Sequence, residues 1–232
     1  MNHSEDILFF SWKLLASSAL FALLLCSALM VIVLYRISPI IQSRRGQSLR
    51  DQHVRETSRL GGIGIAWTFI ITVTLLWLLP FEERGLGLKS LDLTRMLGLT
   101  VGGGLAWALG FVDDVFQIRA RWKLCGQFAV AVLAILSGFE FRDLQGPFFQ
   151  SLLLGDWSWL VTLFWIVGVM NAINLIDGLD GLASGLAMVA LSVMGLMCWS
   201  QGNFALLLVV MVALGATMGF WTFNRPPASI FM

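Results

Sequence analysis

Residues 14–35 read LLASSALFALLLCSALMVIVLY, and this stretch contains no charged side chain. A helix needs about 20 consecutive apolar residues to cross the hydrocarbon core of a bilayer, so the stretch predicts a membrane-spanning helix. A continuous apolar run favours a helix over a barrel strand, because barrel strands alternate apolar and polar residues. The composition agrees: 58% of the 232 residues are hydrophobic and 12% are charged, whereas soluble domains carry about 25% charged residues.

Further apolar stretches along the chain predict an all-α fold, a polytopic transmembrane helix bundle of about seven spans. No linker, repeat or low-complexity tract interrupts it, so we expect a single domain over residues 1–232. The fourth span is the shortest. The predicted spans are Leu14–Tyr35, Gly61–Pro80, Leu93–Val112, Leu124–Phe139, Trp157–Ile173, Leu182–Ser200 and Asn203–Phe223.

The basic residues gather on one side of the predicted membrane. Ten of the 15 lysine and arginine residues follow the first, third and seventh spans, and five lie on the other side. Because cytoplasmic segments carry the excess of basic residues, we expect the segments that contain Arg44, Asp114 and Asp177 to be cytoplasmic and the N-terminus to lie outside. A net charge of +1 gives no indication of nucleic-acid binding.

An acidic pair, Asp113 and Asp114, closes the third predicted span. A charged side chain in the hydrocarbon core costs about 2.5–3.5 kcal/mol on insertion scales, and adjacent carboxylates also repel each other. Neighbouring residues of a helix point about 100° apart, so one carboxylate can approach a metal-bound phosphate while the other accepts a proton. A solvated acidic helix end remains the alternative interpretation.

A second polar stretch, NAINLIDGLDGLASG at residues 171–185, lies between two apolar spans. If it is helical, Asn174 and Asp177 share a face, and so do Asp177 and Asp180. Hard oxygen ligands of this kind suit Mg²⁺, which keeps several waters and shares its coordination sphere with substrate phosphates. An ordinary inter-helix turn is the alternative, although such a turn needs only one or two of these residues.

Basic residues accompany both polar segments. His53 and Arg59 precede the glycine pair Gly61-Gly62 and can meet phosphate groups, or they can anchor the membrane edge. Lys123 follows the acidic pair in the same predicted loop. Its ammonium group can bind a diphosphate or extend to the membrane interface.

The order and spacing of these segments resemble those of the polyprenyl-phosphate N-acetylhexosamine-1-phosphate transferases, of glycosyltransferase family 4 type. The resemblance rests on Asp113-Asp114, on NLIDGLDG at 174–181 and on HVRETSRLGG at 53–62, and it runs from about Arg36 to Met232. The family includes the undecaprenyl-phosphate GlcNAc-1-phosphate transferases of O-antigen and teichoic acid initiation and the phospho-MurNAc-pentapeptide translocase. The short loop after Asp114 and the Arg-x-Gly-Gly sequence favour the GlcNAc branch, whereas Glu-Thr-Ser stands where the family usually has Pro-Thr-Pro.

The resemblance implies transfer of N-acetylhexosamine-1-phosphate from a UDP-sugar to undecaprenyl phosphate at the bacterial inner membrane, with release of UMP. GlcNAc is the expected sugar, QuiNAc and FucNAc stay open, and a homodimer stays open. The implied cofactor is Mg²⁺, or Mn²⁺ in its place, with Asn174 as a metal ligand. Asp113 and Asp114 are the implied catalytic residues. The implied substrate-binding residues are Lys123, Asp177, Asp180, His53 and Arg59.

The resemblance also bears on the C-terminal end of the sequence. In the family, a segment like Asn224–Met232 leads into a Gly-Asp-x-Gly-Ser motif whose aspartate resembles a Mg²⁺ ligand, and further spans follow. We therefore expect this chain to be the N-terminal part of the family fold, C-terminally truncated and catalytically incomplete.

Other classes of membrane protein fit the sequence less well. Intramembrane aromatic prenyltransferases need another aspartate two residues after an Asp pair, and the run here is Asp-Asp-Val-Phe-Gln. A transporter is expected to carry carboxylates near the bilayer midplane and internal repeats, whereas Asp177 and Asp180 fall at a span boundary. An inactive relative of the family remains an open alternative.

Overall fold

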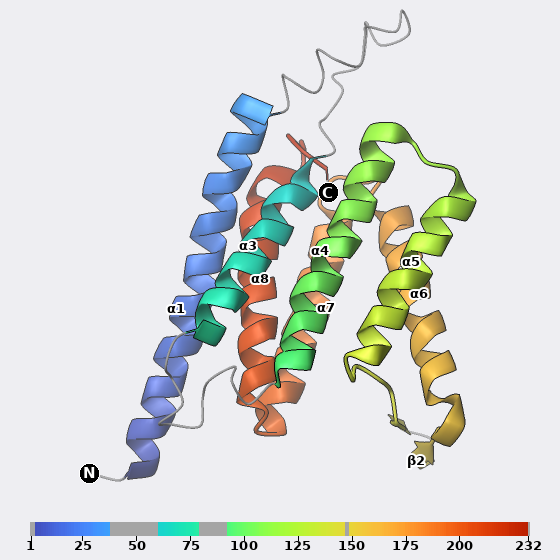
Figure 1. The fold of residues 1–232 in the computed structure, drawn as a ribbon. Helices are drawn as coiled ribbons and strands as arrows, with labels where there is room; N and C mark the ends of the chain where they lie inside the picture. Colours follow the sequence, from blue (N-terminus) through green and yellow to red (C-terminus); the bar gives the residue numbers. More distant parts are fainter. Residues whose placement is uncertain (1–2, 38–59, 79–91, 147–148, 232) are drawn as a thin grey trace, which may run out of the picture. The chain divides into compact units, whose positions relative to one another are not determined.

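The structure is a computed structural model that describes residues 3–37, 60–78, 92–146 and 149–231 (Figure 1). The all-α class is confirmed, with one small antiparallel hairpin added. The helices are α1 (His3–Ile32, continued by a π-helical turn at Val33–Ile37), α3 (Gly61–Leu78), α4 (Leu93–Phe116), α5 (Ala120–Leu136), α6 (Ser158–Ile176), α7 (Leu182–Ser200) and α8 (Phe204–Asn224). The strands are β1 (Asp143–Gly146) and β2 (Phe149–Leu153), and a 3₁₀ turn at Gly155–Trp157 leads into α6.

Six of the helices in the described part of the chain are long and apolar enough to cross a membrane, all but α5. The helix α5 has 17 residues and corresponds to the fourth predicted span. It begins and ends earlier than predicted. Its end is set by the cap at Ser137 and by Gly138, which follows with a φ of 86°. A glycine in this left-handed conformation is a common helix terminator.

The chain forms two compact units, Met1–Leu91 with Ile176–Met232, and Asp92–Leu175. The expectation of a single domain stays a prediction. In the first unit α8 is the central helix and packs against α1, α3 and α7. Its side chains Val212, Ala216 and Phe220 are fully buried.

Two glycines of α8 allow the close contact with α1. A Cβ atom added at Gly219 would lie 2.6 Å from the carbonyl oxygen of Leu23, and one at Gly215 would collide with the carbonyl of Ala19. Small residues spaced four apart let the backbones of membrane helices approach closely. The sequence Gly-Ala-Thr-Met-Gly at 215–219 therefore fixes this helix pair.

In the second unit α4 packs against α5, and hydrogen bonds described below join α5 to α6. At the end where α6 begins, the hydroxyl of Thr162 accepts a hydrogen bond of 2.9 Å from the backbone nitrogen of Phe141, and Ser158 donates to the carbonyl of Phe141. The hairpin follows, with Asp143 opposite Leu153.

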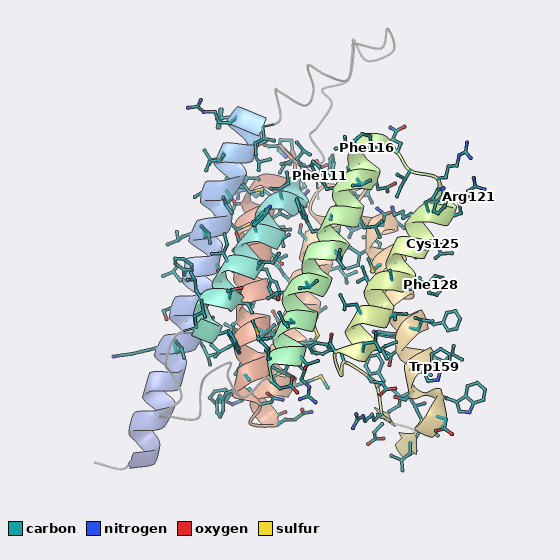
Figure 2. The ribbon with its side chains drawn as sticks, viewed as in Figure 1. Phe111, Phe116, Arg121, Cys125, Phe128 and Trp159 are labelled. Atoms are coloured by element: carbon teal, nitrogen blue, oxygen red, sulfur yellow. The ribbon has the colours of Figure 1, made fainter. Side chains whose placement is uncertain are left out.

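The two sides of α5 differ in chemistry. Figure 2 shows Arg121, Cys125 and Phe128 along the side of α5 that is turned away from α4. Residues two positions apart on a helix point about 200° apart, so Lys123 and Gln127 lie on the other side. This separation places Lys123 and Gln127 toward the neighbours of α5 in the unit.

Candidate active site

The acidic pair lies in the last turn of α4. Gln117 ends the helix with a φ of 49°, and its backbone nitrogen donates a hydrogen bond of 2.8 Å to the carbonyl of Asp113. Three residues later α5 begins at Ala120. The short connection brings the first turn of α5, with Lys123, beside the last turn of α4.

Lys123 joins two of the predicted site residues. Its Nζ atom lies 2.6 Å from Oδ2 of Asp113 and 2.8 Å from Oδ1 of Asn174, and it donates a hydrogen bond to each. The side chains of Lys123 and Asp113 are 19% and 21% exposed. The lysine side chain is therefore held against Asp113 and Asn174.

The charges in this cluster compensate each other. A charged group that is largely removed from water is costly unless an opposite charge and hydrogen bonds accompany it. Asp113 supplies the opposite charge and Asn174 supplies a second acceptor. A displaced Asn174 would leave the ammonium group of Lys123 with one fewer acceptor.

Asp114 follows Asp113 on α4 and is half-buried. Because successive helical residues point about 100° apart, the two carboxylates face different surroundings. The predicted division of roles between them stays a prediction.

One turn away from the Lys123 cluster, α5 and α6 share a second polar contact. The amide of Asn171 donates to Oε1 of Gln127 at 2.8 Å, and the amide of Gln127 donates to Oδ1 of Asn171 at 3.3 Å. Gln127 is not among the site residues predicted from the sequence. A polar residue inside an apolar span could have indicated such a contact, because a polar side chain within a membrane span usually has a partner.

Beyond Asn174, α6 ends at Ile176 and a turn occupies residues 177–181. The helix that would place Asp177 and Asp180 on one face therefore does not form. Gly181, with a φ of 71°, is the N-cap residue directly before α7. Glycine adopts this conformation without strain. Residues 174–181 therefore comprise the end of α6, which carries Asn174, and an inter-helix turn.

The carboxylates of this turn belong to the first unit. Asp177 is half-buried and Asp180 is exposed. Oδ2 of Asp180 accepts a hydrogen bond of 3.0 Å from the backbone nitrogen of Ala228. The observed contact of Asp180 is thus with the segment after α8, and its predicted part in substrate binding stays a prediction.

The same segment is held by other polar contacts within the first unit. Asn224, which is 1% exposed, accepts a hydrogen bond of 2.7 Å from Ser184 and donates one of 2.9 Å to the carbonyl of Ile230. The backbone nitrogen of Gly61 donates to the carbonyl of Phe231 at 2.9 Å. The predicted residues His53 and Arg59 lie outside the described residues.

The residues present can be tested as ligands of a divalent cation. Within the described ranges, no three His, Cys, Asp or Glu side chains form a group suited to a metal. However, Oδ2 of Asp113 and Oδ1 of Asn174 converge on one positive point, the Nζ atom of Lys123. Mg²⁺ typically takes one or two protein carboxylates and fills its sphere with waters and substrate phosphates, so this oxygen pair fits such an ion.

Comparison with known proteins places the chain in a family. Residues 96–232, which include the Asp pair, Lys123 and the Asn174–Gly181 stretch, match glycosyl transferase family 4. The chain belongs to this family. The expected resemblance is confirmed, and with six apolar helices in its described part this member of family 4 is a multi-pass membrane protein.

The curated relatives of this family 4 chain carry two kinds of name. A "Probable undecaprenyl-phosphate N-acetylglucosaminyl 1-phosphate transferase" of Bacillus subtilis is 41% identical over 140 residues, which is 60% of this chain and 39% of that protein. A "Phospho-N-acetylmuramoyl-pentapeptide-transferase" of Bacillus licheniformis is 32% identical over 208 residues, and one of Bacillus subtilis 33% over 205. These matches cover 81% of this chain and 60% of either relative. The chain thus spans less than two thirds of the length of these relatives.

Proposed function

We propose that the protein transfers GlcNAc-1-phosphate from UDP-GlcNAc to undecaprenyl phosphate at the cytoplasmic face of a bacterial inner membrane. A phosphate oxygen of the lipid attacks the β-phosphorus of the UDP-sugar, and a new diphosphate bond forms. The bond between the α- and β-phosphates breaks, and UMP leaves. This reaction initiates a cell-surface polysaccharide.

The observation that carries the proposal is the convergence of Asp113, Lys123 and Asn174 within the second unit. Phosphoryl transfer depends mainly on in-line positioning and on neutralised charge. The Lys123 ammonium group can neutralise a non-bridging oxygen of the donor diphosphate. Asp113 and Asp114 are proposed to ready the acceptor phosphate by taking its proton if it carries one.

The proposed cofactor is Mg²⁺, for which Mn²⁺ can substitute. Asp113 and Asn174 would hold it, because their oxygens already face a common cation. When bound, the ion neutralises charge that develops on the transferred phosphate and on the leaving UMP. Asp177 and Asp180 are proposed to contact the donor, as are His53 and Arg59.

The choice between two sugars rests on the relatives. The relative named for N-acetylglucosaminyl transfer is 41% identical, and those named for phospho-N-acetylmuramoyl-pentapeptide transfer are 32–33% identical over a longer match. We favour GlcNAc because the relative named for its transfer has the higher identity, 41% over 140 residues. Transfer of phospho-MurNAc-pentapeptide is the second candidate.

The proposed function is tested by UMP release. The complete protein that contains this sequence is purified from a host that lacks its own transferases of this type and is supplied with undecaprenyl phosphate and Mg²⁺. We expect UMP release from UDP-GlcNAc that requires the lipid phosphate, and none from UDP-MurNAc-pentapeptide. UMP release from UDP-MurNAc-pentapeptide alone would make transfer of phospho-MurNAc-pentapeptide the favoured function. Release from neither donor would refute the proposed reaction.

The orientation of the second unit gives a separate prediction. In a protein whose native Cys26, Cys125 and Cys198 are replaced by alanine, we expect an impermeant maleimide to label Asp156→Cys in intact cells. We expect Gln117→Cys, in the turn between α4 and α5, to be labelled only after permeabilisation, because basic residues mark the cytoplasmic side. Labelling of Gln117→Cys from outside would reverse the topology.

A further inference from the structure

The amide pair between Gln127 and Asn171 is closed on both sides. Each side chain donates to the other, and Asn171 also donates a hydrogen bond of 2.8 Å to the carbonyl of Val167 on its own helix. Gln127 is 2% exposed. Asn171 is half-buried, so the pair is a largely buried, reciprocal link between α5 and α6.

This pair lies about one helical turn away from the Lys123 cluster on both helices. Gln127 follows Lys123 by four residues on α5, and Asn171 precedes Asn174 by three residues on α6. Residues with these spacings lie on the same face of a helix, about one turn apart. The two helices consequently meet through two stacked polar contacts, Lys123 with Asn174 and Gln127 with Asn171.

Only one register of the two helices satisfies both contacts. A step of one residue rotates a helix by about 100° and shifts it by about 1.5 Å, which would separate both pairs at once. An amide buried without a partner is costly, so the reciprocal pair opposes such a step. Apolar side chains at positions 127 and 171 would impose no such restriction, because apolar contacts are not directional.

We propose that Gln127 and Asn171 are positioning residues whose reciprocal amide pair sets the register of α5 against α6 and thereby holds Asn174 within hydrogen-bonding distance of Lys123. Their effect on catalysis passes through Lys123 and Asn174, and this part of the inference rests on the proposed function.

The test measures the surroundings of Lys123 directly. The chain has three lysines, at positions 13, 89 and 123, so labelling of the purified protein with an amine reagent can be read at each by peptide mass spectrometry. Lys13, which is exposed on α1, serves as the internal reference. In Gln127→Leu and Asn171→Leu we expect the labelling of Lys123 relative to Lys13 to rise about threefold, the change in population that corresponds to one interhelical hydrogen bond in a membrane bundle.

Thr162→Val is the matched control. It also removes a hydrogen bond of α6, the one to the backbone of Phe141, but at the end of the helix that is remote from the Lys123 cluster. We expect it to lower thermal stability without changing the labelling of Lys123. Unchanged labelling in both leucine variants, or an equal rise in Thr162→Val, would overturn the proposal.

Two further variants guard against general misfolding. Gln127→Met keeps the length of the side chain and is expected to behave as Gln127→Leu does. The exchanged pair Gln127→Asn with Asn171→Gln keeps two amides in contact, and we expect its labelling to return to the wild-type value. Labelling in the exchanged pair as high as in the leucine variants would contradict a role for the amide contact.

Measuring UMP release in the same variants separates this inference from the proposed function. In the leucine variants we expect kcat for UMP release to fall by at least the same factor of about three, whereas Thr162→Val keeps the wild-type kcat. If the wild type releases no UMP but the labelling changes as expected, the proposed function fails and the register inference stands. If the wild type is active and labelling does not change, the register inference fails alone.

Discussion

The Asn174→Ala variant is expected to lose a factor of about 10²–10³ in the rate of UMP release, the loss typical of removing one electrostatic stabiliser from an active site. Its Oδ1 atom accepts a hydrogen bond of 2.8 Å from Lys123, which is also paired with Asp113 at 2.6 Å. Alanine removes this acceptor and one of the two oxygens proposed to hold the metal ion. Lys123 then has Asp113 as its remaining partner in the cluster, which alters the position of its charge.

The asparagine at position 203 provides the control. Its side chain caps α8 by accepting a hydrogen bond of 3.2 Å from the backbone nitrogen of Leu206, so Asn203→Ala makes the same change at a helix end without catalytic groups. It should cost about 1 kcal/mol of stability and leave turnover unchanged. Both variants are compared for UMP release at saturating Mg²⁺ and for the amount of protein in the membrane.

Asp114→Asn should reproduce the loss seen in Asn174→Ala, because it removes a charge from the pair that prepares the lipid phosphate. Near-normal turnover in either variant would show that the cluster at the end of α4 is not the catalytic centre. A loss of protein from the membrane in step with the loss of activity would instead assign these residues a structural role.

The second large effect is expected on stability, from Gly219→Ala in α8. The new Cβ atom would lie 2.6 Å from the carbonyl oxygen of Leu23 and 2.9 Å from Cβ of Cys26. Both atoms belong to the rigid part of α1, so the helices must move apart. Overpacking of this kind costs about 1–3 kcal/mol.

Gly185→Ala in α7 is the matched control, because nothing lies within 4 Å of a Cβ atom added there. The unfolding midpoints of the purified variants in detergent, on heating or with increasing SDS, give the measurement. We expect Gly219→Ala to unfold well before the wild type and Gly185→Ala to unfold with it or slightly after it. Equal midpoints for the two variants would show that the contact between α1 and α8 tolerates an added methyl group.

The candidate site illustrates how far a sequence pattern reaches. Asp113, Lys123 and Asn174 were predicted as site residues separately, from local features such as a charge at the end of an apolar span. Their direct contact was not predicted, because Lys123 and Asn174 are 51 residues apart and lie on different helices. Which faces two helices present to each other depends on how their side chains fit, and this information is not contained in either segment alone.

Two other features needed the structure for the same reason. In the sequence Gln127 is a polar residue within the fourth predicted span, and only the packing of α5 on α6 revealed Asn171, 44 residues away, as its partner. The stretch at 174–181 has spacings compatible with a helix, but α6 ends at Ile176. Gly181 adopts a left-handed conformation there, and the Asp180 carboxylate accepts a hydrogen bond from the backbone of Ala228.

The sequence by itself determined that this is an all-α, multi-pass membrane protein of a particular transferase family. Apolar length and the order of polar motifs are properties of contiguous segments, and the bilayer requires each spanning segment to satisfy its own backbone hydrogen bonds. Only the tertiary structure decided that Lys123 bridges Asp113 and Asn174, that Gln127 pairs with Asn171, and that Gly219 meets α1. These contacts depend on the register and rotation of whole helices, which are set by packing and by the pairing of buried polar groups.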